Sequence, residues 1–153
     1  MVHRRARIGL ILTVAVLLGA AREWLFLNLN YTIDHRSHDR PYSYAHSAFT
    51  KATSNLNLGQ LLSLKWTLAL VFIGAMLLLS VVLARLLFGD HRHLRTVIIG
   101  FLTIGTLAAL LEWIGRVVHP AFGDIAVKLL HMVQYPVVLL FLWAGAMLSR
   151  RTA

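Results

Sequence analysis

The stretch that decides the fold is WTLALVFIGAMLLLSVVLA, which runs from Trp66 to Ala84 and contains 19 residues without a charged side chain. About 20 consecutive apolar residues in a helix cross the roughly 30 Å hydrocarbon core of a bilayer. Hydrophobic residues make up 58% of the chain, which is more than a soluble domain of this length usually contains. We therefore predict a membrane span over residues 61–88, with Lys65 near its start.

Other apolar runs of similar length predict three further spans, over residues 8–27, 96–118 and 125–148. Four spans of this length with short turns between most of them favour helices packed side by side. The sequence thus predicts an all-α fold, an integral membrane four-helix bundle that forms a single domain over residues 1–153.

The region between the first two predicted spans is different, because residues 28–60 are polar and contain Pro41. We predict a long extracytoplasmic loop there, with a short interfacial helix around Ser43–Ser54. An alternative stays open for the first run. Three arginines, an apolar stretch and the small residues Gly19-Ala20-Ala21 are also typical of a cleaved signal peptide.

Positive charge flanks the apolar runs and predicts their orientation. The net charge is +9, and arginines gather in the first residues, in the turn at 89–95 and at the C-terminus. Short basic segments of membrane proteins stay in the cytoplasm, so we predict that both termini are cytoplasmic. In so apolar a chain, the charge indicates contact with anionic lipids of a bacterial inner (cytoplasmic) membrane in a multi-pass arrangement, rather than with nucleic acid.

Ionisable and polar side chains lie near one end of each predicted span, and the predicted topology puts these ends in the outer leaflet. Charged side chains at or within a bilayer are costly, so they commonly pair, reach the interface or mark a functional site. The candidate ligand- or partner-binding residues are Arg22, Glu23, Lys65, Glu112, Arg116, Lys128, His131, Gln134 and Tyr135.

Two interpretations of these residues stay open. In the first, the cations anchor the spans at the interface and the carboxylates form salt bridges, as Glu112 and Arg116 could do because they share a helix face. In the second, the residues line a polar cavity that opens outward and binds a ligand or a partner segment. Tryptophans toward the same span ends fit an aromatic belt, which favours anchoring for Lys65 and Lys128.

Catalysis and cofactor binding have little support in the residues. The chain has no cysteine, Gly-rich phosphate loop, nucleophile elbow or HExxH motif, so we expect no enzyme activity and no cofactor. An intramembrane enzyme that pairs His131 with Glu112 stays an alternative, whereas bis-histidine haem lacks a second histidine well inside a span. No spacing matches a known metal site, and the nearest candidate ligands are His35, His38, Asp39 and His46.

Three short patches carry a resemblance to a known group. Arg22-Glu23-Trp24-Leu25-Phe26 closes the first run, Lys65 opens the second, and Gln134-Tyr135-Pro136 precedes a leucine-rich stretch in the last. These patches resemble the small membrane proteins encoded beside exosortases, the membrane cysteine transpeptidases of bacterial C-terminal sorting systems. The group's Tyr-Asp-Pro after Leu-Phe is absent here, and Tyr135 separates the Gln-Pro pair. The resemblance implies an accessory subunit without catalysis of its own.

Two hypotheses from different classes follow. The first is a non-enzymatic accessory or interaction subunit of a bacterial inner-membrane system, which docks a membrane-protein partner through its outer charged residues and long loop. The second is a small-molecule- or ion-binding, transporter-like bundle with Glu23 or Glu112 as a membrane-embedded carboxylate. A dry, internally paired cluster would support the first, and an unpaired carboxylate in a water-filled cavity would support the second. The sequence predicts no particular oligomeric state.

Overall fold

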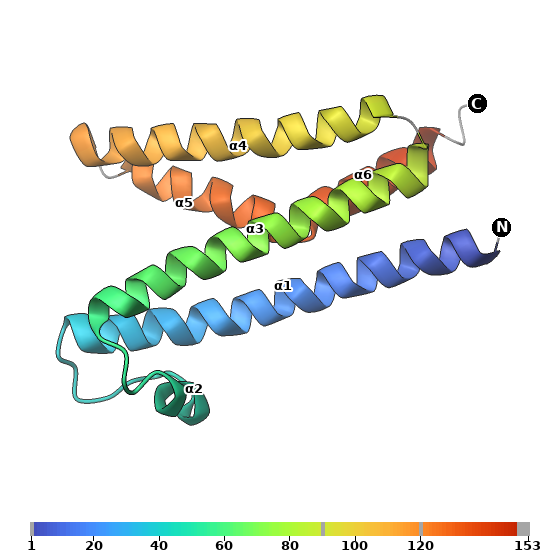
Figure 1. Ribbon diagram of the computed structural model, residues 1–153. Coiled ribbons are helices and arrows are strands. Elements are labelled where there is room, and N and C mark those ends of the chain that lie inside the picture. Colours follow the sequence, from blue (N-terminus) through green and yellow to red (C-terminus); the bar gives the residue numbers. More distant parts are fainter. Residues whose placement is uncertain (1, 90, 120, 150–153) are drawn as a thin grey trace. The chain divides into compact units, whose positions relative to one another are not determined.

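The protein is helical throughout the part that the structure describes. The computed structural model describes the backbone of residues 2–89, 91–119 and 121–149, and the side chains of these residues except those at positions 2, 3, 91, 92, 116 and 149. In chain order the helices are α1 (Val2–Ser37), α2 (Ser47–Ala52), α3 (Leu58–Phe88), α4 (His91–Val117), α5 (Ala121–Gln134) and α6 (Val137–Ser149) (Figure 1). The predicted all-α class is confirmed for these residues.

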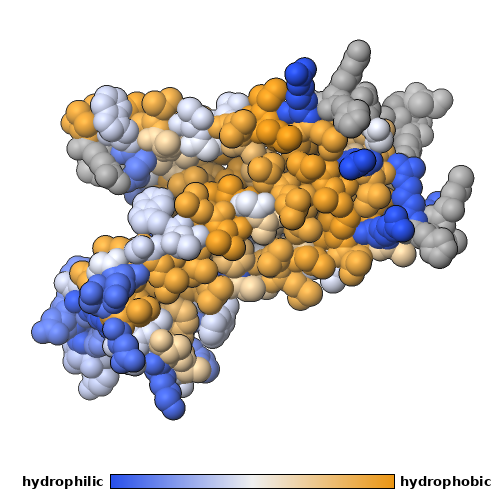
Figure 2. All heavy atoms as spheres, viewed as in Figure 1, coloured by the Kyte–Doolittle hydropathy of each residue, from blue (hydrophilic) through white to orange (hydrophobic). Residues whose placement is uncertain are grey.

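Among the described residues, three helices are long and apolar enough to cross a membrane, namely α1, α3 and α4. The pair α5 and α6 also meets this criterion when taken together, although the two helices are bent by 57° at their junction. Large apolar side chains on these helices stay exposed, including Leu70, Leu78, Leu102 and Phe141. Such contiguous apolar surface is rare on soluble monomers, and Figure 2 shows it across the view. The fold is compatible with a multi-pass membrane protein.

Helix α1 extends ten residues beyond its predicted end at Leu27 and reaches Ser37. Polar residues after Leu27 do not stop it, because two of them hydrogen-bond to carbonyls one turn back: Asn28 Nδ2 donates to the Trp24 carbonyl and Thr32 Oγ1 to the Asn28 carbonyl. The helix ends where Asp39 adopts a left-handed φ of 47° and the Arg40 amide donates to the His35 carbonyl. This is the bonding pattern of a Schellman motif.

The start of α3 is fixed by two reciprocal hydrogen bonds. The Asn57 amide donates to Gln60 Oε1, and the Gln60 amide donates to Asn57 Oδ1, both over 2.8 Å. This capping box satisfies two amides that a helix start otherwise leaves unpaired. At the other end, Gly89 takes a left-handed φ of 70°, which glycine adopts without strain, and α3 stops.

The last predicted span, residues 125–148, is divided in the structure. Helix α5 begins earlier, at Ala121, and ends at Gln134, and α6 begins at Val137. Pro136 lies between them, and proline within a helix lacks the amide hydrogen and collides with the preceding turn. Helical bonding resumes with the Leu140 amide, which donates to the Pro136 carbonyl.

The chain divides into two compact units, each of which is described by itself. Unit 1 comprises Met1–Leu17 and Ile73–Ala153, and unit 2 comprises Leu18–Phe72. The core of unit 2 consists of Leu29, Phe49 and Leu61, with a neighbouring cluster of Phe26, Ala69 and Phe72. Phe49 belongs to the short helix α2, so the predicted helix within Ser43–Ser54 is confirmed and is part of the core.

In unit 1, the closest helix packing in the described residues joins α4 to α5. A Cβ atom added to Gly115 on α4 would lie 2.6 Å from the Gly123 backbone nitrogen and 3.0 Å from its Cα on α5. Ala108 and Ala126, also on these two helices, are fully buried. Small residues let two helix backbones approach one another this closely in a membrane.

Candidate functional site

The predicted site residues fall in both units. Arg22, Glu23 and Lys65 belong to unit 2. The remaining candidates belong to unit 1, where they lie on α4, on α5 or, for Tyr135, between α5 and α6. That all of them form one cluster stays a prediction. The geometry within each unit is described in turn.

Arg22 is a buried cation on α1. Arg22 is 2% exposed, and its guanidinium lies 4.6 Å from the centre of the Phe26 ring. Its Nη1 lies 3.2 Å from Glu23 Oε2. The Glu23 side chain is 58% exposed. An aromatic face and a carboxylate both stabilise a guanidinium away from water. The predicted pairing of Glu23 with Arg22 is therefore present in unit 2.

Lys65 lies on α3, half-buried, two turns after the helix begins. No hydrogen bond or ion pair joins its ammonium to another described residue. The neighbouring Trp66 is exposed. A long cationic side chain beside an exposed tryptophan is the arrangement expected of an interfacial anchor, in which the alkyl stem covers apolar surface and the ammonium reaches water.

Glu112 on α4 lies beside the first turn of α5. Its Oε2 is 3.5 Å from the place that a Cβ on Gly123 would occupy, which is an ordinary van der Waals distance. A negative charge near the start of a helix is favourable, because the first amides point outward there. The side chain of Arg116, the partner that the sequence predicted for Glu112, lies outside the described residues, so this pairing stays a prediction.

The four candidates around α5 have different surroundings. Lys128 and His131 are exposed, Tyr135 is half-buried, and Gln134 is 2% exposed. A fully buried amide in an apolar helix pair is costly unless it is hydrogen-bonded. Among these four candidates, Gln134 thus has the environment that departs furthest from that of an interfacial anchor.

The loop residues named as metal candidates have local structural roles instead. His38 Nδ1 lies 3.1 Å from Asp34 Oδ1, and His46 Nδ1 accepts a hydrogen bond from the Ala48 amide at the start of α2. His35 and Asp39 form the end of α1 described above. Within the ranges that the structure describes, no three His, Asp or Glu side chains are arranged to hold a metal ion.

Unit 2 contains an arrangement that the sequence did not predict, a set of polar bonds that tie the connection between α1 and α3 onto α1. Asn28 is 5% exposed, and its Oδ1 accepts a hydrogen bond from the His46 amide over 2.6 Å. Arg36 Nη2 donates to the Thr53 and Ser54 carbonyls at the end of α2, over 2.9 and 3.0 Å. The only advance signal for these bonds was the polarity of the residues themselves.

Aromatic contacts reinforce these ties. The Trp24 and Phe49 rings meet edge to face at 6.0 Å between centroids, and the Tyr31 and Tyr44 rings lie 5.9 Å apart. Tyr42 and Tyr44 nevertheless remain 76% and 75% exposed. The connection therefore presents an aromatic surface, which we define as the side chains of Tyr42 and Tyr44 together with Tyr31 of α1.

The comparisons with known proteins add no family to this description, since no protein-family model matches the chain and no curated protein or solved structure is significantly similar to it.

Proposed function

We propose that this chain is a non-enzymatic accessory subunit of a bacterial inner-membrane system, and that it docks a membrane-protein partner through the aromatic surface of unit 2. The observation that supports this most is the tied connection: Asn28 and Arg36 hold it on α1 while Tyr42 and Tyr44 stay exposed. A surface that is already ordered loses less conformational entropy on binding. Tyrosine is also enriched among residues that dominate binding energy.

Arg4 and Arg5 near the start of α1 favour cytoplasmic termini by the positive-inside rule, and the proposal accordingly has the aromatic surface outside the cytoplasm. The resemblance to the small proteins encoded beside exosortases makes a membrane transpeptidase of that class the proposed partner. The transporter-like alternative draws less support, because Glu23 lies in an ion pair with Arg22. A carboxylate that already bonds a guanidinium has fewer oxygen lone pairs to offer a transported cation.

Site-specific crosslinking in native membranes tests the proposal. A photoreactive phenylalanine analogue at Tyr42 or Tyr44 should crosslink to one polytopic membrane protein, which mass spectrometry then identifies as a cysteine transpeptidase. The same analogue at Phe141, on α6 and equally exposed, is the matched control and should give lipid adducts instead. Crosslinking of the same protein from both regions, or only lipid adducts at Tyr42 and Tyr44, would contradict the proposal.

Substitution then measures the contribution of the tyrosines. Tyr42→Ser together with Tyr44→Ser should lower co-purification of the partner by at least about tenfold, as expected when interface aromatics are removed. Phe141→Ser is the control and should leave co-purification unchanged. Equal loss in both variants would show that general destabilisation, and not the aromatic surface, controls association.

A further inference from the structure

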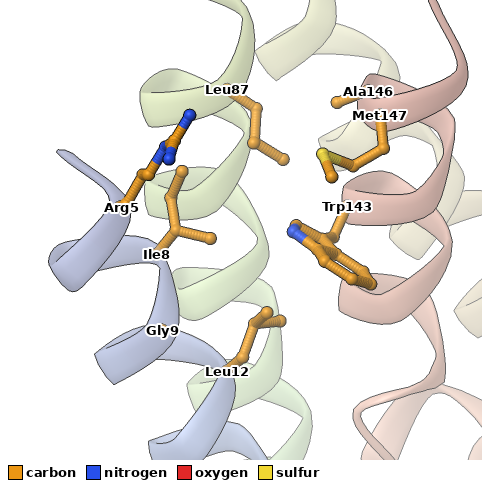
Figure 3. Close-up of a pocket in the computed structure, with 8 residues that line it drawn as sticks. All are labelled: Arg5, Ile8, Gly9, Leu12, Leu87, Trp143, Ala146 and Met147. Carbon is orange, nitrogen blue, oxygen red and sulfur yellow. The ribbon is translucent and has the colours of Figure 1, made fainter. Parts of the chain in front are cut away.

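Unit 1 contains a groove of about 500 Å³ at the end where α1 begins and α3 and α6 end. Its walls are apolar: Ile8 and Leu12 come from α1, Leu87 from α3, and Trp143 and Met147 from α6 (Figure 3). The volume lies within the range of about 300–1,000 Å³ that is typical of small-molecule sites. Ile8, Leu12, Trp143 and Met147 are all partly or well exposed, so the groove is open to its surroundings.

Gly9 lines the groove and has no side chain to fill it. A Cβ atom at Gly9 would meet no other atom within 4 Å. The residue therefore leaves space between α1 and the Trp143 ring, whose nitrogen-bearing edge faces the groove in Figure 3. A narrow apolar space of this kind on the surface of a membrane helix bundle has the shape and chemistry to hold an acyl chain.

A charge stands at the mouth of the groove. Arg5 lines it and is exposed, and no hydrogen bond or ion pair joins its guanidinium to another described residue. Its neighbour Arg4 differs, since Arg4 Nε donates to the Leu86 carbonyl over 2.8 Å and Nη2 to the Leu87 carbonyl over 3.1 Å. Arg4 thus caps the end of α3, which leaves Arg5 to bind a ligand.

The surroundings of the mouth are basic. Arg7 on α1 and Arg85 in the last turn of α3 add to Arg4 and Arg5. The acidic side chains that the structure describes in unit 1 are Glu112 and Asp124. Glu112 lies some 20 residues, or about 30 Å, along α4 from the start of that helix. Neither of these two carboxylates forms an ion pair with Arg5.

We propose that this groove binds one anionic phospholipid, with an acyl chain against Ile8, Leu12 and Trp143 and the headgroup phosphate on the Arg5 guanidinium. The apolar walls and the charged mouth of the groove together favour a lipid. Apolar walls accept an acyl chain, and a guanidinium that has no partner among the described residues forms its strongest hydrogen bonds with a carboxylate or phosphate. The proposal is independent of the docking function of unit 2.

Brominated lipids provide the test, because Trp143 lines the groove. A chain whose other tryptophans are replaced (Trp24→Phe, Trp66→Phe and Trp113→Phe) is reconstituted with mixtures of phosphatidylglycerol and phosphatidylcholine, and either lipid is brominated in turn. Relative quenching of Trp143 fluorescence then gives the preference for phosphatidylglycerol. One surface cation is worth a preference of about fivefold, so we expect a preference of that size. Equal quenching by the two lipids would overturn the proposal.

Matched variants locate the effect. Arg5→Gln should reduce the preference to about one, whereas Arg7→Gln, which removes an exposed arginine outside the groove lining, should retain it. Gly9→Leu should fill the groove and lower quenching by both lipids. Gly74→Leu is its control, since a Cβ at Gly74 also meets nothing within 4 Å, and quenching should stay unchanged. Equal losses in a variant and its control would overturn the site.

Two further arms distinguish other occupants. Millimolar inorganic phosphate should not change the preference, and a loss of preference on its addition would show a phosphate site rather than a lipid site. Light scattering of the purified protein should give the same mass for the parent chain and Gly9→Leu. A parent dimer that Gly9→Leu converts to a monomer would show that a second copy of the chain occupies the groove.

Discussion

Units 1 and 2 hold their helices together by different means. Unit 2 uses polar side chains around a small core: Asn28 accepts from the His46 amide, Arg36 caps α2, and Asn57 and Gln60 cap α3. Unit 1 brings α4 and α5 together at Gly115 and Gly123, where no side chain intervenes. This difference reflects whether the backbone of each region is irregular or regularly helical.

A connection of irregular backbone needs partners for its amides and carbonyls, and polar side chains provide them where the chain leaves regular helix. Two apolar helices in lipid have satisfied backbones already and gain mostly from close van der Waals contact. Loss of a side-chain hydrogen bond should therefore matter in unit 2, and addition of volume should matter in unit 1. Three substitutions test this expectation.

The largest effect is expected from Gly115→Ala. The added methyl group would lie 2.6 Å from the Gly123 nitrogen, so α4 and α5 must separate. Overpacking of this kind usually costs about 1–3 kcal/mol, and contact with a backbone atom puts this case at about 3 kcal/mol. Thermal unfolding in mild detergent should show a clearly lowered midpoint. Gly105→Ala is the control on the same helix, where a Cβ meets nothing within 4 Å, and it should not lower the midpoint.

Asn28→Ala is expected to have a smaller and more local effect. The His46 amide loses its hydrogen-bond acceptor, and the connection between α1 and α3 is no longer bonded to α1 at this point. The free energy of unfolding should fall by about 1–2 kcal/mol. Hydrogen exchange should accelerate in residues 38–57 while exchange in α4 and α5 stays unchanged. Asn30→Ala replaces an exposed asparagine two positions along α1 and serves as the control. Equal acceleration in both variants would contradict the role of Asn28.

Ser80→Ala gives the smallest expected effect and sharpens the comparison. The Ser80 hydroxyl on α3 in unit 1 is fully buried, and it has no hydrogen-bond partner in the described part of the chain. Removing an unsatisfied hydroxyl should leave stability unchanged or raise it by up to about 1 kcal/mol. Denaturation monitored by circular dichroism measures the change. A loss of more than about 1 kcal/mol would show that the buried interior of unit 1 also depends on a polar side chain.

Much of the helical framework was predictable from hydropathy, since apolar runs of sufficient length specify helices in a membrane regardless of neighbours. Helix ends were less predictable. The end of α1 depends on Asp39 in a left-handed conformation, and the start of α3 on the Asn57–Gln60 capping box. The capping box has a recognisable sequence pattern, whereas the extra residues of α1 include Leu29, which packs in the core of unit 2 against residues distant in the chain.

The candidate site was predictable only in part. The Arg22–Glu23 pair was predictable, because its two members are adjacent in the chain. The place of Glu112 beside Gly123 and the groove between Gly9 and Trp143 were not predictable, since each joins residues from different helices.

By itself, the sequence determined that the chain is helical, that its helices are long and apolar enough for a membrane, and where its charges lie along them. Only the tertiary structure decided which arginine caps a helix and which remains available: Arg4 is bonded to the end of α3, and Arg5 lines the groove. Hydropathy and charge are properties of single residues summed along the chain, whereas a bond or a cavity requires two segments to meet in space. Arg4 and Leu86 stand 82 residues apart, so only folding brings them together.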